Sequence, residues 1–327
     1  MDNGNVNGGT LGWAGTGRMG YALAARLLER GFDLAVYNRT RSKAEPLTEL
    51  GTCTVVDTPA ELGERDIVFT MGAGDADFRE LVLGSQGLLS REDRPRIIVD
   101  STTVSAEVSA EVRAEAKRRG TDLLAAPVSG NPRVVEAGKL TYVVSGPEDA
   151  YRDVSPYLEV LGGGATYVGD GDLARLAKIC HNLLLGIVAQ SLAEISVLAE
   201  KGGMSRAALF EFLNKSVMGS MFTRYKTPAY VNLDFHATFT PLLLRKDFDL
   251  GFKAARELDV PMPVAAATLQ MVQALIGAGY REEDFATLLE LQARLSDLDL
   301  ASENAAVSDG LGAEPEAAEA ASPQAAR

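Results

Sequence analysis

The sequence predicts an α/β protein, with a doubly wound parallel sheet in its N-terminal half and an all-α domain after it. Short apolar segments alternate with helical periods as far as about residue 169, and only helical periods follow. A glycine-rich turn joins the first strand to the first helix. Because domains average roughly 100 to 200 residues, a chain of 327 residues is long enough for two. We expect a disordered lead-in (1–9), a sheet domain (10–169), a helical domain (170–298) and a disordered tail (299–327).

Composition and charge limit the classes of partner. The net charge of −13 disfavours nucleic acids and anionic membranes, since both are bound through a basic face. The two cysteines, Cys53 and Cys180, support neither a disulfide framework nor a metal cluster. There is no uninterrupted apolar run of about 18 or more residues. A soluble cytoplasmic protein is therefore expected.

The first strand, expected at 10–14, leads into the turn Gly15-Thr16-Gly17-Arg18-Met19-Gly20. In this pattern the first glycine permits a tight turn, the second lets a pyrophosphate approach the backbone, and the third lets the helix pack on the sheet. The following helix directs its N-terminus at the phosphates. A turn without a ligand can have the same composition, but the strand before it and the helix after it favour dinucleotide binding by these six residues.

The second strand, expected at Leu34–Tyr37, ends at Asn38-Arg39-Thr40. A site for NAD usually places Asp or Glu here to hold the ribose 2′-hydroxyl, whereas a 2′-phosphate requires positive charge and hydroxyl donors. No carboxylate follows the strand, and Arg39 can clamp the phosphate or stack on the adenine. The sequence therefore favours NADP over NAD, although a solvated basic turn would look similar.

The alternation then continues. Strands are expected at 54–56, 66–71, 96–100, 123–126, 141–145 and 165–168, and helical segments at 60–63, 76–83, 105–119 and 148–161. Ligands bind at the carboxyl edge of such a sheet, where three small, polar loops follow strands: 71–74, 100–103 and 127–131. Each could be only a turn or a helix cap. Together they suit a nicotinamide ribose and a small anion, with Met71, Gly72 and Thr103 toward the cofactor and Ser129, Gly130 and Asn131 toward the anion.

One long helix, expected from 173 to 198, is apolar almost all round, so it should be buried between layers. Lys178 lies near its start, and His181 and Asn182, three and four residues later, project from the same face. A buried ammonium usually has a lowered pKa, which makes this lysine a candidate acid or base. The alternative is a lysine that extends its charge to water or pairs with a carboxylate.

The remaining chain is expected to be helical at 205–213, with Ser205 as N-cap, and at 242–258, 264–278 and 282–298. The aromatic stretch at 221–240 shows no clear period, and most of it receives no assignment.

With these residues identified, the chain resembles the β-hydroxyacid dehydrogenase family, which includes 3-hydroxyisobutyrate dehydrogenase, over residues 11–298. The resemblance rests on four motifs in order: the glycine turn with its Asn38-Arg39-Thr40 continuation, Asp100-Ser101-Thr102-Thr103, the segment 125–131, and Lys178 with Asn182. A later Lys246-Asp247 pair also matches. The chain departs from the family pattern at Thr102, Ala125, Asn131 and His181, and the last three departures bear on the substrate.

The resemblance implies a Rossmann-type domain followed by a helical domain, and reversible oxidation of a small 3-hydroxyacid to its semialdehyde or ketoacid. The residues after the second strand make NADP the expected cofactor, with NAD possible. Lys178 would be the acid or base, Asn182 would orient it or the substrate, and Lys246 would reach the nicotinamide side. The implied substrate contacts are Ser129, Gly130, Asn131, Lys178, His181, Asn182 and Asp247. No metal is implied. Relatives associate through the helical domain, so we expect a homo-oligomer, either a dimer or a tetramer.

Two alternatives remain open. Imine reductases and reductive aminases share this architecture but commonly have Asp or Tyr where this chain has Lys178. A non-catalytic dinucleotide-binding scaffold would lack the lysine. Its presence favours the dehydrogenase over both.

Overall fold

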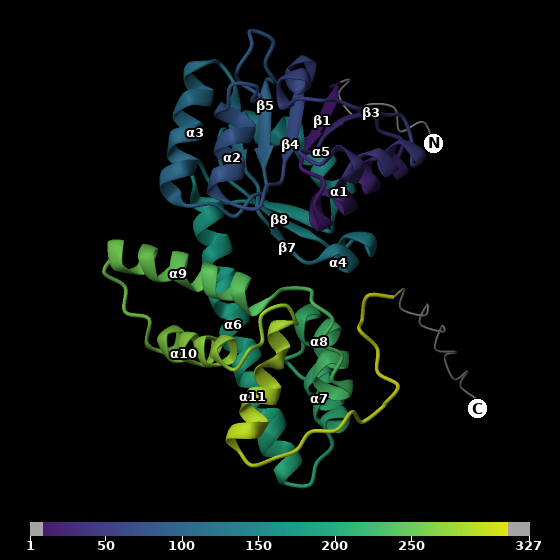
Figure 1. Ribbon diagram of the computed structural model, residues 1–327, viewed down its shortest axis with the longest axis vertical. Coiled ribbons are helices and arrows are strands. Elements are labelled where there is room, and N and C mark those ends of the chain that lie inside the picture. Colours follow the sequence, from purple (N-terminus) through teal and green to yellow (C-terminus); the bar gives the residue numbers. More distant parts are fainter. Residues whose placement is uncertain (1–8, 313–327) are drawn as a thin grey trace, which may run out of the picture. The chain divides into compact units, whose positions relative to one another are not determined.

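The computed structural model describes residues 9–312 (Figure 1). Within them the chain divides into two compact units between Asn182 and Leu183. The division falls within the longest helix, α6 (Leu173–Lys201). The first turns of α6, including Lys178, therefore belong to the first unit. The residues expected in the lead-in at 1–8 and in the tail at 313–327 lie outside the described part of the chain.

The first unit contains a six-stranded parallel sheet with strand order β3-β2-β1-β4-β5-β6. The strands are β1 (Leu11–Ala14), β2 (Leu34–Tyr37), β3 (Cys53–Val55), β4 (Ile67–Thr70), β5 (Ile97–Asp100) and β6 (Asp122–Ala125). The order reverses between β1 and β4, so a crevice opens at the carboxyl ends of these two strands. The predicted doubly wound α/β architecture is confirmed.

Helices cover both faces of this sheet because its strands alternate their apolar side chains between two cores. Leu11 and Trp13 of β1 belong to one core, whereas Ala14 belongs to the other. The first core is shared with α1 (Arg18–Glu29) and α5 (Glu148–Leu161), and the second with α2 (Asp75–Leu83) and α3 (Ala106–Arg118). Short 3₁₀ helices lie at Arg41–Lys43, Glu45–Glu49 and Pro59–Glu64.

A second, three-stranded sheet was not foreseen from the sequence. It has the order β7 (Val128–Ser129), β8 (Thr141–Val144) and β9 (Gly164–Tyr167), with β7 antiparallel to β8, and α4 (Pro132–Glu136) lies between β7 and β8. The segment 127–131 was expected to be only a loop. That expectation is wrong for Val128 and Ser129, because a two-residue strand is too short to show a period of two.

The second unit is helical, as expected. Its elements are the rest of α6 from Leu183 on, α7 (Arg206–Lys215), α8 (Met221–Asn232), α9 (Pro241–Glu257), α10 (Pro263–Gly277), a 3₁₀ turn at Phe285–Thr287 and α11 (Leu288–Leu295). Ser205 caps α7 as predicted, by accepting a hydrogen bond from the Ala208 amide.

The sequence left most of 221–240 without an assignment, and one helix assignment in this unit is wrong. The stretch 221–240 contains α8, which begins with a reciprocal capping box between Ser220 and Thr223. Its aromatic residues and internal Pro228 hid the helical period. The helix expected at 282–298 is shorter, because Asp284 instead caps the 3₁₀ turn that precedes α11.

The described part of the expected disordered tail has specific partners. Glu303 accepts hydrogen bonds from the amides of Arg206 and Ala207, the first two residues of α7. Asn232 and Ala305 form two further hydrogen bonds. Asn232 Nδ2 donates to the Ala305 carbonyl, and the Ala305 amide donates to Asn232 Oδ1. Disorder from residue 299 was therefore the wrong expectation for this stretch. Its composition is polar, and its contacts join residues 73 to 97 positions apart, so no local sequence pattern predicts them.

The surface of α6 also differs from expectation. Burial between layers was predicted, yet within this chain Leu184 is 60% exposed and Leu198 is 72% exposed. One 18-residue window of this helix has a mean hydropathy of 1.6, enough by length and composition to cross a membrane. Half of that window is buried within the structure, and core helices of soluble proteins pass the same test.

Candidate active site

The glycine turn lies at the point where the strand order reverses. Gly15 has φ +100°, and a Cβ there would overlap the carbonyl oxygen of Met71, so the turns after β1 and β4 touch. A Cβ on Gly20 would overlap the Gly15 carbonyl oxygen, which also accepts a hydrogen bond from Trp13 Nε1 at 3.0 Å. Gly15 and Gly20 are therefore required by the fold itself.

Gly17 has no such requirement. It precedes the first turn of α1 with φ −66°, an ordinary value, and a Cβ there would meet no atom within 4 Å. A larger side chain would fit the protein but would fill the space in front of the helix N-terminus, where a pyrophosphate binds in dinucleotide sites. The glycine at this position fits a dinucleotide cofactor.

Asn38 organises the same turn. Its Oδ1 accepts the Thr16 amide at 2.9 Å, and its Nδ2 donates to the Thr40 carbonyl at 2.8 Å. The Thr16 hydroxyl is buried, and within residues 9–312 it has no hydrogen-bond partner. A bound cofactor would give this hydroxyl a polar neighbour. This is a second observation that fits a dinucleotide at the glycine turn.

Arg39 is 83% exposed and pairs with Asp77 of α2, with 3.0 Å between Arg39 Nη1 and Asp77 Oδ1. The sequence has no carboxylate directly after β2, but the fold brings one there from 38 residues away. Asp77 Oδ2 also accepts the Ala73 amide. A 2′-phosphate bound by Arg39 would therefore have to compete with this carboxylate.

The segment after β5 is more structural than expected. The Asp100 carboxylate is fully buried, and its Oδ1 accepts the hydroxyls of Thr70 and Thr102 at 2.6 and 2.7 Å. Thr102 Oγ1 in turn accepts the Gly72 amide at 2.8 Å. Asp100 and Thr102 therefore hold the turn after β4 in place. Thr103 is half-buried, and its contact with the cofactor stays a prediction.

Arg175, in the first turn of α6, was missed by sequence reasoning. Its side chain is 6% exposed, and Nη2 donates to Asp100 Oδ2 at 2.8 Å. Nη1 donates to the Thr102 carbonyl, and Nε donates to Ser109 Oγ, both at 2.7 Å. The available signal was a second cation on an apolar helix, three residues before Lys178.

The structure brings Ser129, His181 and Asn182 together. His181 Nδ1 lies 2.9 Å from Asn182 Oδ1, which can only accept, and His181 Nε2 lies 3.0 Å from Ser129 Oγ. A neutral ring therefore donates from Nδ1 and accepts the Ser129 hydroxyl at Nε2. Although His181 is exposed, desolvation by surrounding atoms lowers its pKa, and the charge of Lys178 lowers it further. The Asn182 hydrogen bond acts in the opposite direction.

Other predicted site residues are less directly placed. Asn131 is buried and caps α4 by accepting the Val134 amide at 3.1 Å, so its oxygen has a structural role. Gly130 has φ +139°, and a Cβ there would lie 2.9 Å from side-chain atoms of Leu140 and Val134. Lys246 and Asp247 lie on α9 in the second unit, with 3.7 Å between Nζ and Oδ1. Their place at the site stays a prediction.

Comparison with known proteins identifies the family. A profile described as the NAD binding domain of 6-phosphogluconate dehydrogenase matches residues 10–169, and one described as NAD-binding of NADP-dependent 3-hydroxyisobutyrate dehydrogenase matches 173–292. An uncharacterised oxidoreductase of Shewanella frigidimarina is 33% identical over 82% of this chain and 93% of its own length. The chain belongs to the 3-hydroxyisobutyrate dehydrogenase family.

Named members support the same assignment. Mouse mitochondrial 3-hydroxyisobutyrate dehydrogenase is 28% identical, with 86% of each chain covered. The solved structure of Mycobacterium tuberculosis 3-hydroxyisobutyrate dehydrogenase with L-serine is 27% identical, with a TM-score of 0.75 over 86% of this chain and 98% of that one. The chain is a hydroxyacid dehydrogenase of this family with NAD(P)-binding domains.

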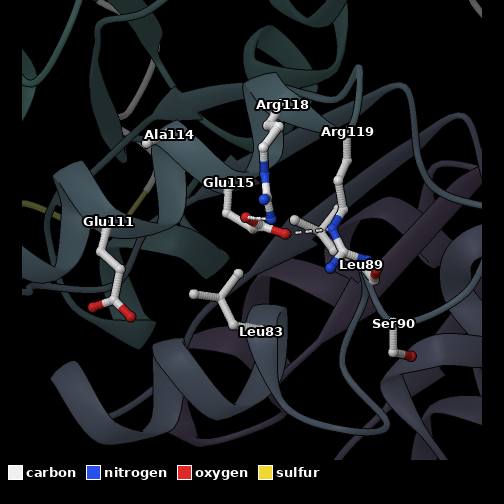
Figure 2. Close-up of a pocket in the computed structure, with 8 residues that line it drawn as sticks. All are labelled: Leu83, Leu89, Ser90, Glu111, Ala114, Glu115, Arg118 and Arg119. Carbon is white, nitrogen blue, oxygen red and sulfur yellow. Dashed lines mark hydrogen bonds and ion pairs between the residues drawn. The ribbon is translucent and has the colours of Figure 1, made fainter.

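A cavity of about 480 Å³ lies away from the family site (Figure 2). Figure 2 shows Glu115 directed at Arg118 and Arg119, beside Leu83 and Ser90. Half of its lining comes from α3, which begins after the carboxyl end of β5 and ends just before β6. The last residues of α3 are therefore near the amino edge of the sheet. The cavity is therefore not the cofactor site. Among residues 9–312, no three His, Cys, Asp or Glu side chains are placed to hold a metal.

The link between Lys178 and His181 can be measured. We expect the His181 ring to titrate below the ordinary histidine value of about 6.5, and Lys178→Met to raise its pKa, because a nearby positive charge is removed. Proton NMR resolves this readily, since the chain has only two histidines. Lys117→Met, at an exposed site on α3, is the control. An unchanged His181 pKa in Lys178→Met would show that the lysine charge lies elsewhere.

Proposed function

We propose that this protein interconverts a small 3-hydroxyacid and its semialdehyde or ketoacid with NADP, and that Lys178 is the acid–base group. The observation that carries the proposal is the grouping of Ser129, His181 and Asn182 around the turn of α6 that bears Lys178. One turn earlier, Arg175 joins α6 to the end of β5, at the sheet edge that also bears the glycine turn.

In oxidation, the substrate hydroxyl gives its proton to Nζ of Lys178 while the carbon–hydrogen bond breaks and a carbonyl forms. The nicotinamide ring supplies the acceptor for the hydride when the cofactor is bound. In reduction, Lys178 returns the proton to the oxygen. This role requires a neutral amine in one direction and an ammonium in the other.

The neighbouring residues serve binding and orientation. Asn182 is buried and fixed by His181, so it orients the lysine or the substrate oxygen. Backbone donors of Ser129 and Gly130, with the Ser129 hydroxyl, would receive the substrate carboxylate. Because that hydroxyl is donated to His181 when the ring is neutral, it has to rotate to serve the anion.

Support for NADP comes from Arg39 and from the absence of a carboxylate among the residues that directly follow β2. The profile matching residues 173–292 is also described for an NADP-dependent enzyme. Asp77 acts against this preference, since it occupies Arg39 and would repel a phosphate.

Two opposite substitutions test the cofactor preference. Arg39→Asp should weaken NADP by about 10- to 100-fold, because a charge-assisted contact to phosphate contributes roughly 1.5 to 3 kcal/mol, and should change NAD binding far less. Asp77→Asn should tighten NADP slightly. Fluorescence of Trp13, the only tryptophan, reports binding directly, since its indole donates to the glycine turn. Equal losses for NADP and NAD in Arg39→Asp would exclude a phosphate contact.

Lys178→Met tests the acid–base role. The variant should fold and bind cofactor, because methionine keeps the apolar stem, while kcat should fall by about 10² to 10⁴-fold with little change in KM. The oxidation rate of the native enzyme should rise with pH, since only the neutral amine accepts a proton, and the variant should lose that dependence. Lys117→Met is the control. Near-native turnover with an unchanged pH profile in Lys178→Met would transfer the role to another group, with His181 the first to test.

We also propose that the protein is a homodimer or homotetramer assembled through its helical unit. The exposed apolar side chains of α6 in this unit, Leu184, Ile195 and Leu198, support this, because Ile195 and Leu198 are three residues apart on one helix face and association would cover them. Sedimentation at micromolar concentration should show a dimer or tetramer, and Leu198→Glu should shift it toward monomer. A monomeric native protein would contradict the proposal.

A further inference from the structure

The ion pair between Arg175 and Asp100 is buried at both ends, at 6% and 0% exposure. Buried ion pairs seldom add net stability, because desolvation of the two charges offsets their attraction. The more specific property of this pair is its geometry. The guanidinium donates in three directions at once, to Asp100 Oδ2, the Thr102 carbonyl and Ser109 Oγ, so its plane is fixed.

The Asp100 carboxylate joins two parts of the site. Through Oδ1 it receives the Thr102 hydroxyl, whose oxygen accepts the Gly72 amide of the turn after β4. Through Oδ2 it receives Arg175. Lys178 follows Arg175 by three residues, about 4.5 Å along the helix axis. The turn expected to meet the cofactor and the turn that bears the lysine are therefore held by one carboxylate.

The start of α6 has a second connection within the same unit. Asp172, just before the helix, accepts Ser109 Oγ and Arg113 Nη2 of α3, both at 2.6 Å. Its carbonyl accepts the Arg175 amide at 3.0 Å. These contacts hold the beginning of the helix in place along its axis, whereas the Arg175 fork fixes its rotation relative to β5.

We propose that Arg175 is a positioning residue that sets Lys178 at the cofactor edge through the Asp100 carboxylate. The inference rests on the proposed acid–base role of Lys178. Arg175 does not itself touch the reacting atoms. A shift of about 1 Å in a catalytic group can reduce a rate by about 100-fold, so loss of this fork lowers turnover while the glycine turn still binds cofactor.

The test is to combine Arg175→Gln with Lys178→Met. In the native background Arg175→Gln should lower kcat by about 10- to 100-fold. The NADP dissociation constant, measured by Trp13 fluorescence, should change by less than about threefold. In the Lys178→Met background the same substitution should change the residual single-turnover rate by less than about threefold, because the group it positions is gone. Arg175→Lys, which keeps the charge but not the fork, should be intermediate.

Two controls separate positioning from general damage. Arg79→Gln removes an exposed arginine–glutamate pair between α2 and α3 and should leave kcat unchanged. If Arg175→Gln does not fold because Asp100 is left unpaired, the double variant Asp100→Asn/Arg175→Gln replaces it. The double variant has no unpaired buried charge, and we expect the same changes in kcat and in NADP binding.

Equal rate losses in both backgrounds would overturn the positioning role, as would an unchanged kcat in folded Arg175→Gln. These outcomes differ from failure of the proposed function, which would appear as near-native turnover in Lys178→Met alone.

Discussion

The candidate site depends most on the hydrogen bonds and the ion pair that the buried carboxylate of Asp100 forms. A fully buried carboxylate without partners would be strongly destabilising, so this side chain requires its two hydroxyl donors and its guanidinium together. Meeting that requirement draws the turn after β4 and the first turn of α6 to the carboxyl end of β5. The geometry of the site therefore follows from the need to satisfy one charge.

The rest of the cofactor edge follows from backbone constraints. The reversal of strand order places the ends of β1 and β4 side by side, and the two glycines that the fold requires let their turns touch. Gly17 has no role in that packing, which leaves the space in front of α1 to a ligand. A rigid turn with open space before a helix N-terminus is suited to bind a pyrophosphate.

Much of this could be predicted from the sequence because the signals were local. The predicted features are the strand, glycine turn and helix at residues 10–29, the Ser205 cap and the spacing of Lys178 and Asn182. Each of them lies within one short stretch of the chain. The missed features involve distant pairs. Asp77 reaches Arg39 across 38 residues, and Arg175 reaches Asp100 across 75, and neither distance leaves a pattern in the chain. The capping role of Asn131 was also missed, and its contact with the substrate stays a prediction.

A crystal structure of the protein with NADP⁺ and a 3-hydroxyacid bound tests most directly whether Lys178 is the acid–base group. We expect its Nζ within about 3 Å of the substrate hydroxyl oxygen, with Arg175 still paired to Asp100. A complex in which Nζ points away from that oxygen, and another side chain contacts it, would contradict the proposed mechanism.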